Sequence, residues 1–286
     1  MPATGVRLSA HEHELGAWSR TCRPPDPRLR GLVGRELLGY QHWRAGFASW
    51  LEPPRPELTM MIDLDGWIEA DGQRLPDAWI GGLSDRYTIV GFGDSYGSID
   101  LKLSPLGAYR LLGLPLAELQ GACVSLADVF GPAGAQLAPR LRDTDDWVER
   151  FDVLEAFLLA RLADAQEVDP AVAWAWQRLV QSDGRARIGT LAAEVGASRR
   201  HLGERFHRQI GLAPKTAARV LRFHAVCRRI EHEPERWADI AWAAGYADQS
   251  HFNREFRRLA GITPTEFISR RIPDGGLVGD GCAVAE

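Results

Sequence analysis

The sequence predicts an α+β N-terminal domain, built as a small β-sandwich or barrel followed by helices, and an all-α C-terminal domain. Three observations predict this fold class. Short β-prone runs separated by turn residues fill residues 6–103, helical periodicity follows Pro105, and a motif near the C-terminus occurs twice. A chain of 286 residues with 45% apolar content can bury two cores. We place the N-terminal domain at 1–168, the C-terminal domain at 169–272, and a Gly-rich tail that we expect to be disordered at 273–286.

Within the N-terminal domain, the β-prone runs are short and are punctuated by Gly, Pro and Asp. Strands are expected at 58–64, 66–70, 78–82, 87–92 and 98–103, with a turn at Asp71-Gly72. This spacing is typical of a small sandwich or barrel.

Helical periodicity then takes over, most clearly at 146–162, where Trp147, Phe151, Leu154, Phe157, Leu158 and Leu162 lie mostly three or four residues apart. This helix packs on the sheet, or it forms a dimer seam with a second subunit. Asp169-Pro170 is a helix start signal, an N-cap carboxylate followed by proline at the first helical position. We therefore place the domain boundary just before it.

One sequence motif occurs twice in the last third of the chain. From Ser198 it contains SRRHLGERFHRQIGLAP, and from Asp248 it contains DQSHFNREFRRLAGITP. Each copy follows a short helix of small residues that ends at a glycine, Gly196 or Gly245. A short helix, a glycine turn and a second helix with arginines on its outer side predict a helix-turn-helix motif, present in two copies.

Each second helix has one apolar stripe and one polar face. The stripes, which must face the domain, are Leu202, Phe206 and Ile210 in the first copy and Phe252, Phe256 and Leu259 in the second. On the opposite faces, the side chains can pair with base edges or phosphates. These candidates for DNA contact are Arg199, Arg200, Gly203, Glu204 and His207 in the first copy, and Gln249, Ser250, Asn253, Arg254, Arg257 and Arg258 in the second. For Arg257 and Arg258 we favour phosphate contact over a merely solvated face.

Residues 214–231 are predicted to form one continuous helix between the two motifs, because apolar residues recur there at steps of 3, 4 and 3. A helix of roughly 18 residues spans about 27 Å at about 1.5 Å per residue. With the width of the motifs themselves, this would set the two reading helices roughly one DNA turn, about 34 Å, apart. Thr263-Pro264-Thr265-Glu266 predicts a capping box at the start of the last helix.

Charge is divided between the two domains. Residues 181–272 hold 17 Lys and Arg against 10 Asp and Glu, and the remainder holds 17 against 28. The basic part favours a nucleic-acid partner, whereas the acidic part would be repelled by phosphates. The sequence thus predicts that only the C-terminal domain binds double-stranded DNA.

Five short motifs of the second copy carry a family resemblance: Ile240-Ala241, Gly245-Tyr246, Ser250-His251-Phe252, Arg254-Glu255-Phe256 and Gly261-Ile262-Thr263-Pro264. With them, the stretch from about Ile188 to Arg271 resembles the DNA-binding domain of AraC/XylS-type transcription regulators. The resemblance implies two helix-turn-helix motifs bridged by a long helix, with Arg199, Arg200, Gly203, Glu204 and His207 reading bases in the first motif and Gln249, Ser250, Asn253 and Arg254 in the second. It also implies RNA polymerase as a partner. Two departures are Ala217, where an aromatic residue is usual, and Gly203, where a longer polar side chain is frequent, so the first motif should rely on Arg199 and Arg200.

The N-terminal half resembles, more loosely, the sensor domain of an uncharacterised subgroup of the same family, through residues 25–29, Gly81-Gly82 and residues 103–109. That resemblance gives the domain its place in the architecture but no ligand. Our hypothesis is that the domain senses a small-molecule effector or mediates homodimerisation. Effector pockets are mostly apolar and aromatic, which makes the tryptophans candidates, although core packing is the favoured explanation for any single one. The candidates for an effector site are Trp43, Trp50, Trp67 and Trp79, with Trp18 in the same tryptophan-rich region.

The sequence gives little support for a metal site or a catalytic site. The four cysteines are too scattered for a zinc site, and His11, His13 and His42 lack a spaced third partner, so we expect no metal or cofactor. Asp63 and Asp65 could be paired catalytic carboxylates, but strand-end and turn chemistry explains them better. An enzyme fused to a DNA-binding unit is the alternative function. Because no phosphate loop, dinucleotide fingerprint or nucleophile motif supplies its chemistry, we predict a non-enzymatic regulator without a membrane span, placed in the cytoplasm.

Overall fold

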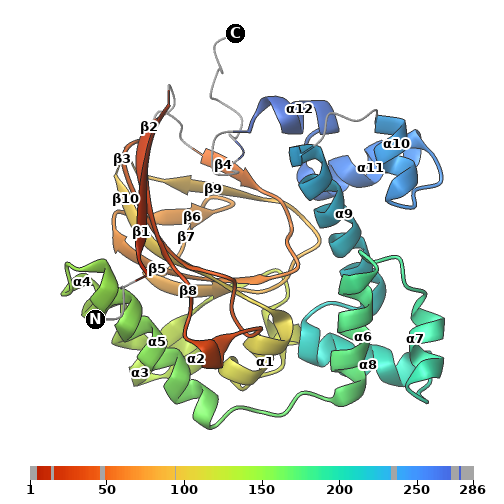
Figure 1. Ribbon diagram of the computed structural model, residues 1–286, viewed down its shortest axis with the longest axis horizontal. Coiled ribbons are helices and arrows are strands. Elements are labelled where there is room, and N and C mark those ends of the chain that lie inside the picture. The colour runs from red at the N-terminus through yellow and green to blue at the C-terminus, as the bar shows by residue number, and fades with distance from the viewer. Residues whose placement is uncertain are drawn as a thin grey trace.

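The computed structural model describes residues 5–13, 16–45, 49–93, 95–232, 237–271 and 277, and within these ranges the side chains of residues 13, 16, 43–45 and 231–232 are left undescribed. The tail predicted at 273–286 lies outside the described residues apart from Leu277. The predicted order, a β-rich domain with helices followed by a helical domain, is confirmed (Figure 1).

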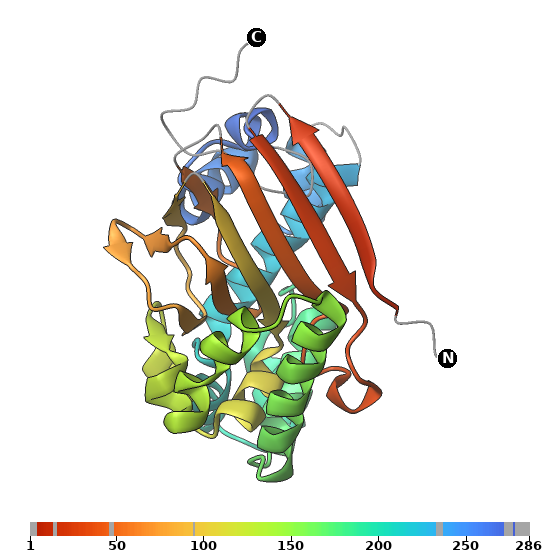
Figure 2. The same cartoon turned by 90° about the vertical axis from the view of Figure 1, so that its left-hand side faces the viewer.

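Most of the N-terminal strands form one antiparallel sheet, which lies across the front of the molecule in Figure 2. In spatial order its strands are β1 (Arg7–His13), β2 (Gly16–Arg23), β3 (Leu37–Ala45), β10 (Tyr96–Leu103), β5 (Leu58–Asp65), β8 (Ala78–Gly81) and β11 (Cys123–Ser125). The strands β10 and β5 pair from Gly97 opposite Asp65 to Leu103 opposite Leu58. This register turns Tyr96, Ser98, Asp100 and Lys102 to one face of the sheet and Ile99, Leu101 and Leu103 to the other, because side chains alternate along a strand.

A second, smaller sheet faces the first. Its strands, in spatial order, are β4 (Ser49–Glu52), β9 (Thr88–Phe92), β6 (Ile68–Ala70) and β7 (Gln73–Arg74). The predicted turn between β6 and β7 is confirmed, with φ of 50° at Asp71 and 76° at Gly72. Two facing sheets make the expected sandwich.

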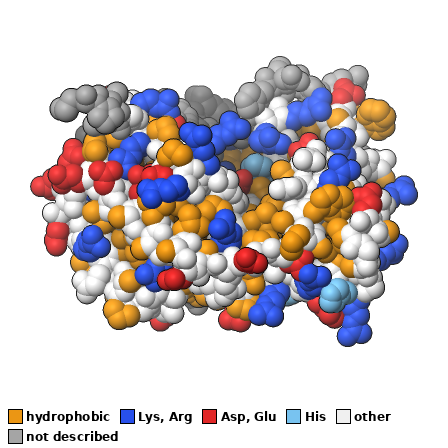
Figure 3. Space-filling model, turned by 60° about the horizontal axis from the view of Figure 1, so that its bottom comes forward, with side chains coloured by type: hydrophobic (Ala, Val, Ile, Leu, Met, Phe, Trp, Pro, Cys, Tyr) orange, Lys and Arg blue, Asp and Glu red, His pale blue; other side chains and the backbone are white. Residues whose placement is uncertain are grey.

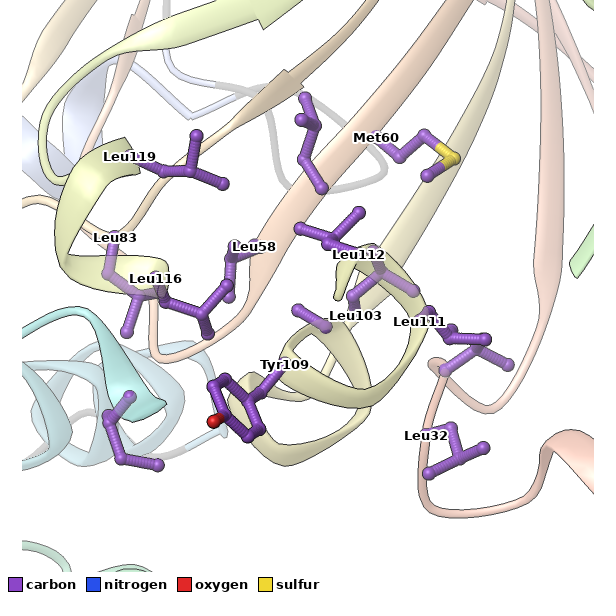
Figure 4. Close-up of a cluster of buried hydrophobic side chains, with 14 of the residues drawn as sticks. Leu32, Leu58, Met60, Leu83, Leu103, Tyr109, Leu111, Leu112, Leu116 and Leu119 are labelled. Atoms are coloured by element: carbon purple, nitrogen blue, oxygen red, sulfur yellow. The ribbon is translucent and has the colours of Figure 1, made fainter. Parts of the chain in front are cut away.

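Helices close the sandwich at one end, below the sheets in Figure 1. They are η1 (Pro27–Leu29), α1 (Pro105–Leu112), η2 (Leu116–Leu119), α2 (Leu126–Phe130), α3 (Pro132–Ala135), α4 (Leu137–Arg142) and α5 (Trp147–Ala163). Figure 4 shows side chains of α1 and η2, such as Leu112 and Leu116, meeting Leu58 and Met60 of β5. The apolar ends of the strands are thereby removed from water.

The dimer seam suggested for the helix at 146–162 is wrong. In α5, Phe151, Leu154 and Leu158 are fully buried within this chain, and Trp147 packs against Gly39 of β3, where a Cβ would lie only 2.1 Å from the ring. The apolar residues of α5 do lie on one side of the helix, as their periodicity predicts, but that side is covered by the chain's own sheet and helices.

The C-terminal domain is entirely helical in its described residues. Its helices are α6 (Pro170–Gln181), α7 (Ile188–Glu194), α8 (Arg199–Ile210), α9 (Pro214–His232), α10 (Trp237–Ala243), α11 (Gln249–Ala260) and α12 (Pro264–Ser269). The predicted caps are confirmed: Asp169, Ser198 and Asp248 each accept a backbone N–H of the helix they start, and Thr263 with Glu266 forms the capping box. In Figure 1, α9 runs between α6–α8 at its lower end and α10–α12 at its upper end.

The two helix-turn-helix units are buried differently. One hydrophobic cluster runs from the N-terminal domain through Tyr109 and Leu116 into Phe206 and Ile210 of α8. The second unit has a cluster of its own around Phe252, to which Leu51 of β4 and Leu277 also belong. The first unit therefore shares its core with the N-terminal domain. Among the described helices, none combines the length and apolar content that a membrane-spanning helix needs.

Candidate nucleic-acid interface

The outer face of α8 presents charged side chains at its N-terminal end. Ser198 caps the helix by accepting the His201 N–H at 3.1 Å, and the stripe Leu202, Phe206 and Ile210 is buried, as predicted. Arg199, Arg200 and Glu204 are exposed. Arg200 Nε donates to Glu204 Oε1 at 2.9 Å, one helical turn away. The two side chains would have to part before each could contact a different base.

Gly203 lies on the same face and leaves it open. A Cβ built at Gly203 would have no neighbour within 4 Å. Because α8 continues regularly through this position, no close contact in the folded chain requires a glycine here. The space beside Arg199 and Arg200 is therefore available to a partner.

Further along α8, the predicted contact residue His207 is turned to the N-terminal domain. Its Nε2 lies 2.9 Å from Gln120 Oε1, just after η2, and the residue is only partly exposed. The structure therefore separates His207 from the exposed group of Arg199, Arg200 and Glu204. Contact between His207 and DNA stays a prediction, and it would require the bond to Gln120 to break.

The second unit brings its candidates together more completely. All six residues predicted on α11 are exposed, and Asp248 caps the helix through the His251 N–H at 2.7 Å. A groove of about 690 Å³ lies along the helix, lined by Gln249, Asn253, Arg254, Arg257 and Arg258 together with Trp237 and residues 263–265. Three arginines and two amides line it, without a carboxylate among the described lining residues.

Arg258 also takes part in a contact between the domains. Its Nη2 donates to Asp85 Oδ2 at 2.6 Å, and Nη2 of Arg219 in α9 donates to the same oxygen at 2.7 Å. Sequence reasoning missed Arg219, because its spacing within α9 gives no sign that it faces the N-terminal domain.

The arginines of α9 mostly hold the helical domain together. Arg222 donates to the carbonyl of Gly184 at 3.5 Å, and its guanidinium lies 5.5 Å from the centre of the Tyr246 ring. Arg228 pairs with Asp183 at 3.1 Å. Arg222 therefore ties Tyr246 of the second unit to the segment between α6 and α7. In Figure 3, Asp and Glu side chains gather at the left-hand edge, while several Lys and Arg side chains lie along the right-hand edge.

A separate cavity of about 550 Å³ lies between the two sheets of the N-terminal domain. Of the four tryptophans predicted for an effector site, Trp50 and Trp79 line it, as does Trp18. Trp67 is not among the residues that line this cavity, and its ring stacks with Arg74 at 5.2 Å. The side chain of Trp43 lies outside the described part of the chain.

The cavity combines an aromatic wall with charged groups. Around Trp18, the rings of His42, Trp50, Phe92 and Tyr96 pack at centroid distances of 5.3 to 6.4 Å. Burial lowers the pKa of His42 to about 4, so its ring is neutral at neutral pH.

On the charged side, Lys102 pairs with Asp100 at 3.0 Å and donates to Thr59 at 2.9 Å, while Arg55 pairs with Glu52 at 2.7 Å. Alternation along β10 turns Tyr96, Ser98, Asp100 and Lys102 inward. The last three lie in the strand predicted at 98–103, and their alternation with apolar residues could have identified them, whereas Tyr96 precedes that strand.

Asp63, considered earlier as a catalytic carboxylate, is buried and accepts the Tyr96 hydroxyl at 2.8 Å. Burial raises its pKa to about 6. Its neighbour in the sequence, Asp65, instead accepts the Ser95 hydroxyl at 3.1 Å. The two carboxylates therefore serve different local contacts. Across the described residues, no group of three His, Cys, Asp or Glu side chains is placed to hold a metal ion.

Comparison with known proteins bears on the helical domain. Residues 191–270 match a family described as a helix-turn-helix domain. The HTH-type transcriptional regulator Rv1931c of Mycobacterium tuberculosis is 30% identical over 87 residues, which is 30% of this chain and 34% of that protein. The HTH-type transcriptional regulator MtrA of Neisseria gonorrhoeae is 25% identical over 80 residues, 28% of this chain and 27% of that protein. The chain thus matches about a third or less of the length of these relatives.

Among solved structures, ToxT from Vibrio cholerae O395 aligns over 81% of this chain and 95% of its own, with 14% identity and a TM-score of 0.46. A transcriptional regulator of Chromobacterium violaceum, described as an AraC-type DNA-binding domain-containing protein, aligns over 37% of this chain and 96% of its own, with 24% identity and a TM-score of 0.34.

Proposed function

We propose that this protein is a sequence-specific DNA-binding transcription regulator of the AraC type, because residues 191–270 match a helix-turn-helix family. The helices α8 and α11 would enter successive major grooves, since α9 holds them at its two ends. The proposal assigns binding functions to the chain and no catalysed reaction.

The observation that carries the proposal is the groove along α11. Arg254, Arg257 and Arg258 supply positive charge, while Gln249 and Asn253 supply amides that can pair with adenine. The capped start of α11 keeps these side chains on a fixed helical face. A surface with this mixture can hold phosphates and distinguish base edges at the same time.

The test begins with the selection of genomic fragments that the full chain binds at low salt, which defines a site. Arg254→Ala should then weaken binding to that site by about 1–3 kcal/mol and change binding to a scrambled duplex much less, because a base contact is lost. Arg140→Ala, in the distant helix α4, removes the same charge and is the control. Equal losses on both duplexes would show that Arg254 only holds phosphate.

We further propose that the cavity between the sheets binds a small-molecule effector. Its volume of about 550 Å³ suits a ligand of drug size, and its lining suits a molecule with a flat apolar body and a polar end. A thermal-shift screen of the full chain would identify such a ligand. Trp50→Phe should then weaken its binding, whereas Trp67→Phe, outside the cavity, should leave it unchanged. Equal effects of the two substitutions would place the ligand elsewhere.

RNA polymerase stays a predicted partner on the sequence resemblance, and homodimerisation stays a prediction as well.

A further inference from the structure

Asp85 joins the two domains through a single carboxylate oxygen. The Nη2 atoms of Arg219 and Arg258, from α9 and α11, lie 2.7 and 2.6 Å from Asp85 Oδ2. The side chain of Asp85 is only 22% exposed, and that of Arg219 is 26% exposed. Two guanidinium groups that converge on one anionic oxygen are arranged as they would be around a phosphate oxygen.

Asp85 is held in place by a well-anchored segment, residues 82–87. Leu83 is buried, its carbonyl accepts the Gly121 N–H at 3.0 Å, and the Gly82 N–H donates to the Ala122 carbonyl at 2.9 Å. Gly82 passes so close to η2 that a Cβ there would lie 1.8 Å from the Leu119 carbonyl oxygen. The carboxylate is therefore presented by a fixed part of the N-terminal domain rather than by a loose side chain.

The same segment covers the C-terminal end of α11. Gly261 ends this helix with φ of 77°, and the ring of Tyr87 lies 2.8 Å from the position of a Cβ at Gly261. Gln120, whose Oε1 accepts the hydrogen bond from His207 Nε2, follows η2 directly. Gln120 thus contacts a predicted DNA-contact residue of α8, and Asp85 contacts one of α11.

Arg258 connects this contact to the groove. It lines the groove together with Arg254 and Arg257, so Asp85 lies at the edge of the surface that we propose for DNA. A phosphate and the Asp85 carboxylate carry like charges and need the same donors, so they cannot occupy this position together.

We propose that Arg219 and Arg258 form a binding site for a DNA phosphate and that Asp85 fills this site in the DNA-free protein. The proposal rests on the DNA-binding function proposed above. DNA then displaces Asp85 when it binds α11, and the N-terminal domain lowers DNA affinity by holding the site. Because such coupling is reciprocal, DNA also loosens the N-terminal domain from α11.

The first experiment measures binding of the full chain to a labelled random-sequence duplex of about 30 base pairs, roughly three helical turns, by fluorescence anisotropy at several salt concentrations. Asp85→Asn keeps the shape of the side chain and removes its charge. We expect about five- to tenfold tighter binding, within the usual range of coupling between sites. Asp145→Asn changes the same charge in an exposed loop between α4 and α5 and should alter affinity less than about twofold. Equal gains in both variants would overturn the proposal, because only overall charge would then matter.

The second experiment uses Arg219→Gln with Arg258→Gln. If both guanidinium groups contact phosphate, the slope of log affinity against log salt should become shallower by up to about 1.8, at about 0.9 for each phosphate contact. In this background Asp85→Asn should give no further gain. An unchanged slope, or a persisting gain, would overturn the phosphate site while leaving DNA binding intact. Failure of the wild type and all variants to bind any duplex at low salt would instead overturn the proposed function, and the phosphate site with it. Circular dichroism of each variant, with affinities referred to the folded fraction, separates these outcomes from misfolding.

Discussion

The two helix-turn-helix units share a motif but differ in how the rest of the chain holds them. The first unit, α7 and α8, continues the hydrophobic core of the N-terminal domain, with Phe206 and Ile210 in the same cluster as Tyr109 and Leu116. The second unit, α10 and α11, has its own aromatic cluster and meets the N-terminal domain through the ion pair between Arg258 and Asp85 and a few apolar contacts. Large apolar contacts resist separation, whereas partly exposed ion pairs contribute little and weaken in salt. The difference indicates that the second unit is the one that can move.

The largest expected effect on stability comes from truncating one core phenylalanine in each unit. Phe206 lies on the buried stripe of α8 and Phe252 on that of α11, and both are fully buried. Truncation of either to alanine should cost about 3–5 kcal/mol. Phe206→Ala should lower the thermal stability of the whole chain, because its core is shared. Phe252→Ala should mainly remove hydrogen-exchange protection from α10–α12 and spare the sheets. Equal loss of protection everywhere in both variants would show that the two units unfold as one.

An intermediate effect depends on pH. His224 of α9 has its pKa lowered to about 4 by burial, and the nearby charges of Arg55 and Arg228 lower it further in the same direction. The unfolded chain therefore binds this proton more strongly than the folded chain. The stability contributed by neutral His224 is complete above pH 6.5 and is lost as the pH falls toward 4.

We expect this group to account for about 1 kcal/mol of stability lost between pH 7 and pH 5, after allowance for partial exposure. Urea unfolding at both pH values measures it, with His224→Phe as the comparison. The variant should lose less stability than the wild type on acidification. An identical loss of stability in the variant and the wild type would show that protonation of His224 does not destabilise the folded state.

The smallest expected effect concerns two glycines, each inside a helix. Gly203→Ala in α8 adds a methyl group to open space and should stabilise the protein by about 0.5–1 kcal/mol, because alanine favours the helix. Gly107→Ala in α1 makes the same change where a Cβ would lie 2.1 Å from the Leu32 carbonyl oxygen, so it should destabilise. Thermal unfolding of the two variants compares them. Destabilisation by Gly203→Ala would show that α8 needs the glycine after all.

The sequence alone determined the elements whose signals are local. Caps at Asp169, Ser198, Asp248 and Thr263 fix where helices begin, and the buried stripes of α8 and α11 follow from spacing along one helix. The duplicated motif could be identified from the sequence for the same reason, because each copy carries its own turn and cap. Most of the candidate DNA-contact residues could be named in this way, because one polar face follows once the apolar face is known.

Only the tertiary structure decided which of these surfaces the rest of the chain already uses. The contact of His207 with Gln120 joins residues 87 positions apart, and that of Arg258 with Asp85 joins residues 173 apart. The inward side chains of the cavity, such as Trp18, Asp100 and Lys102, meet only after two sheets face each other. Such pairings depend on strand register and on how domains dock, and no periodicity within one helix or strand encodes them.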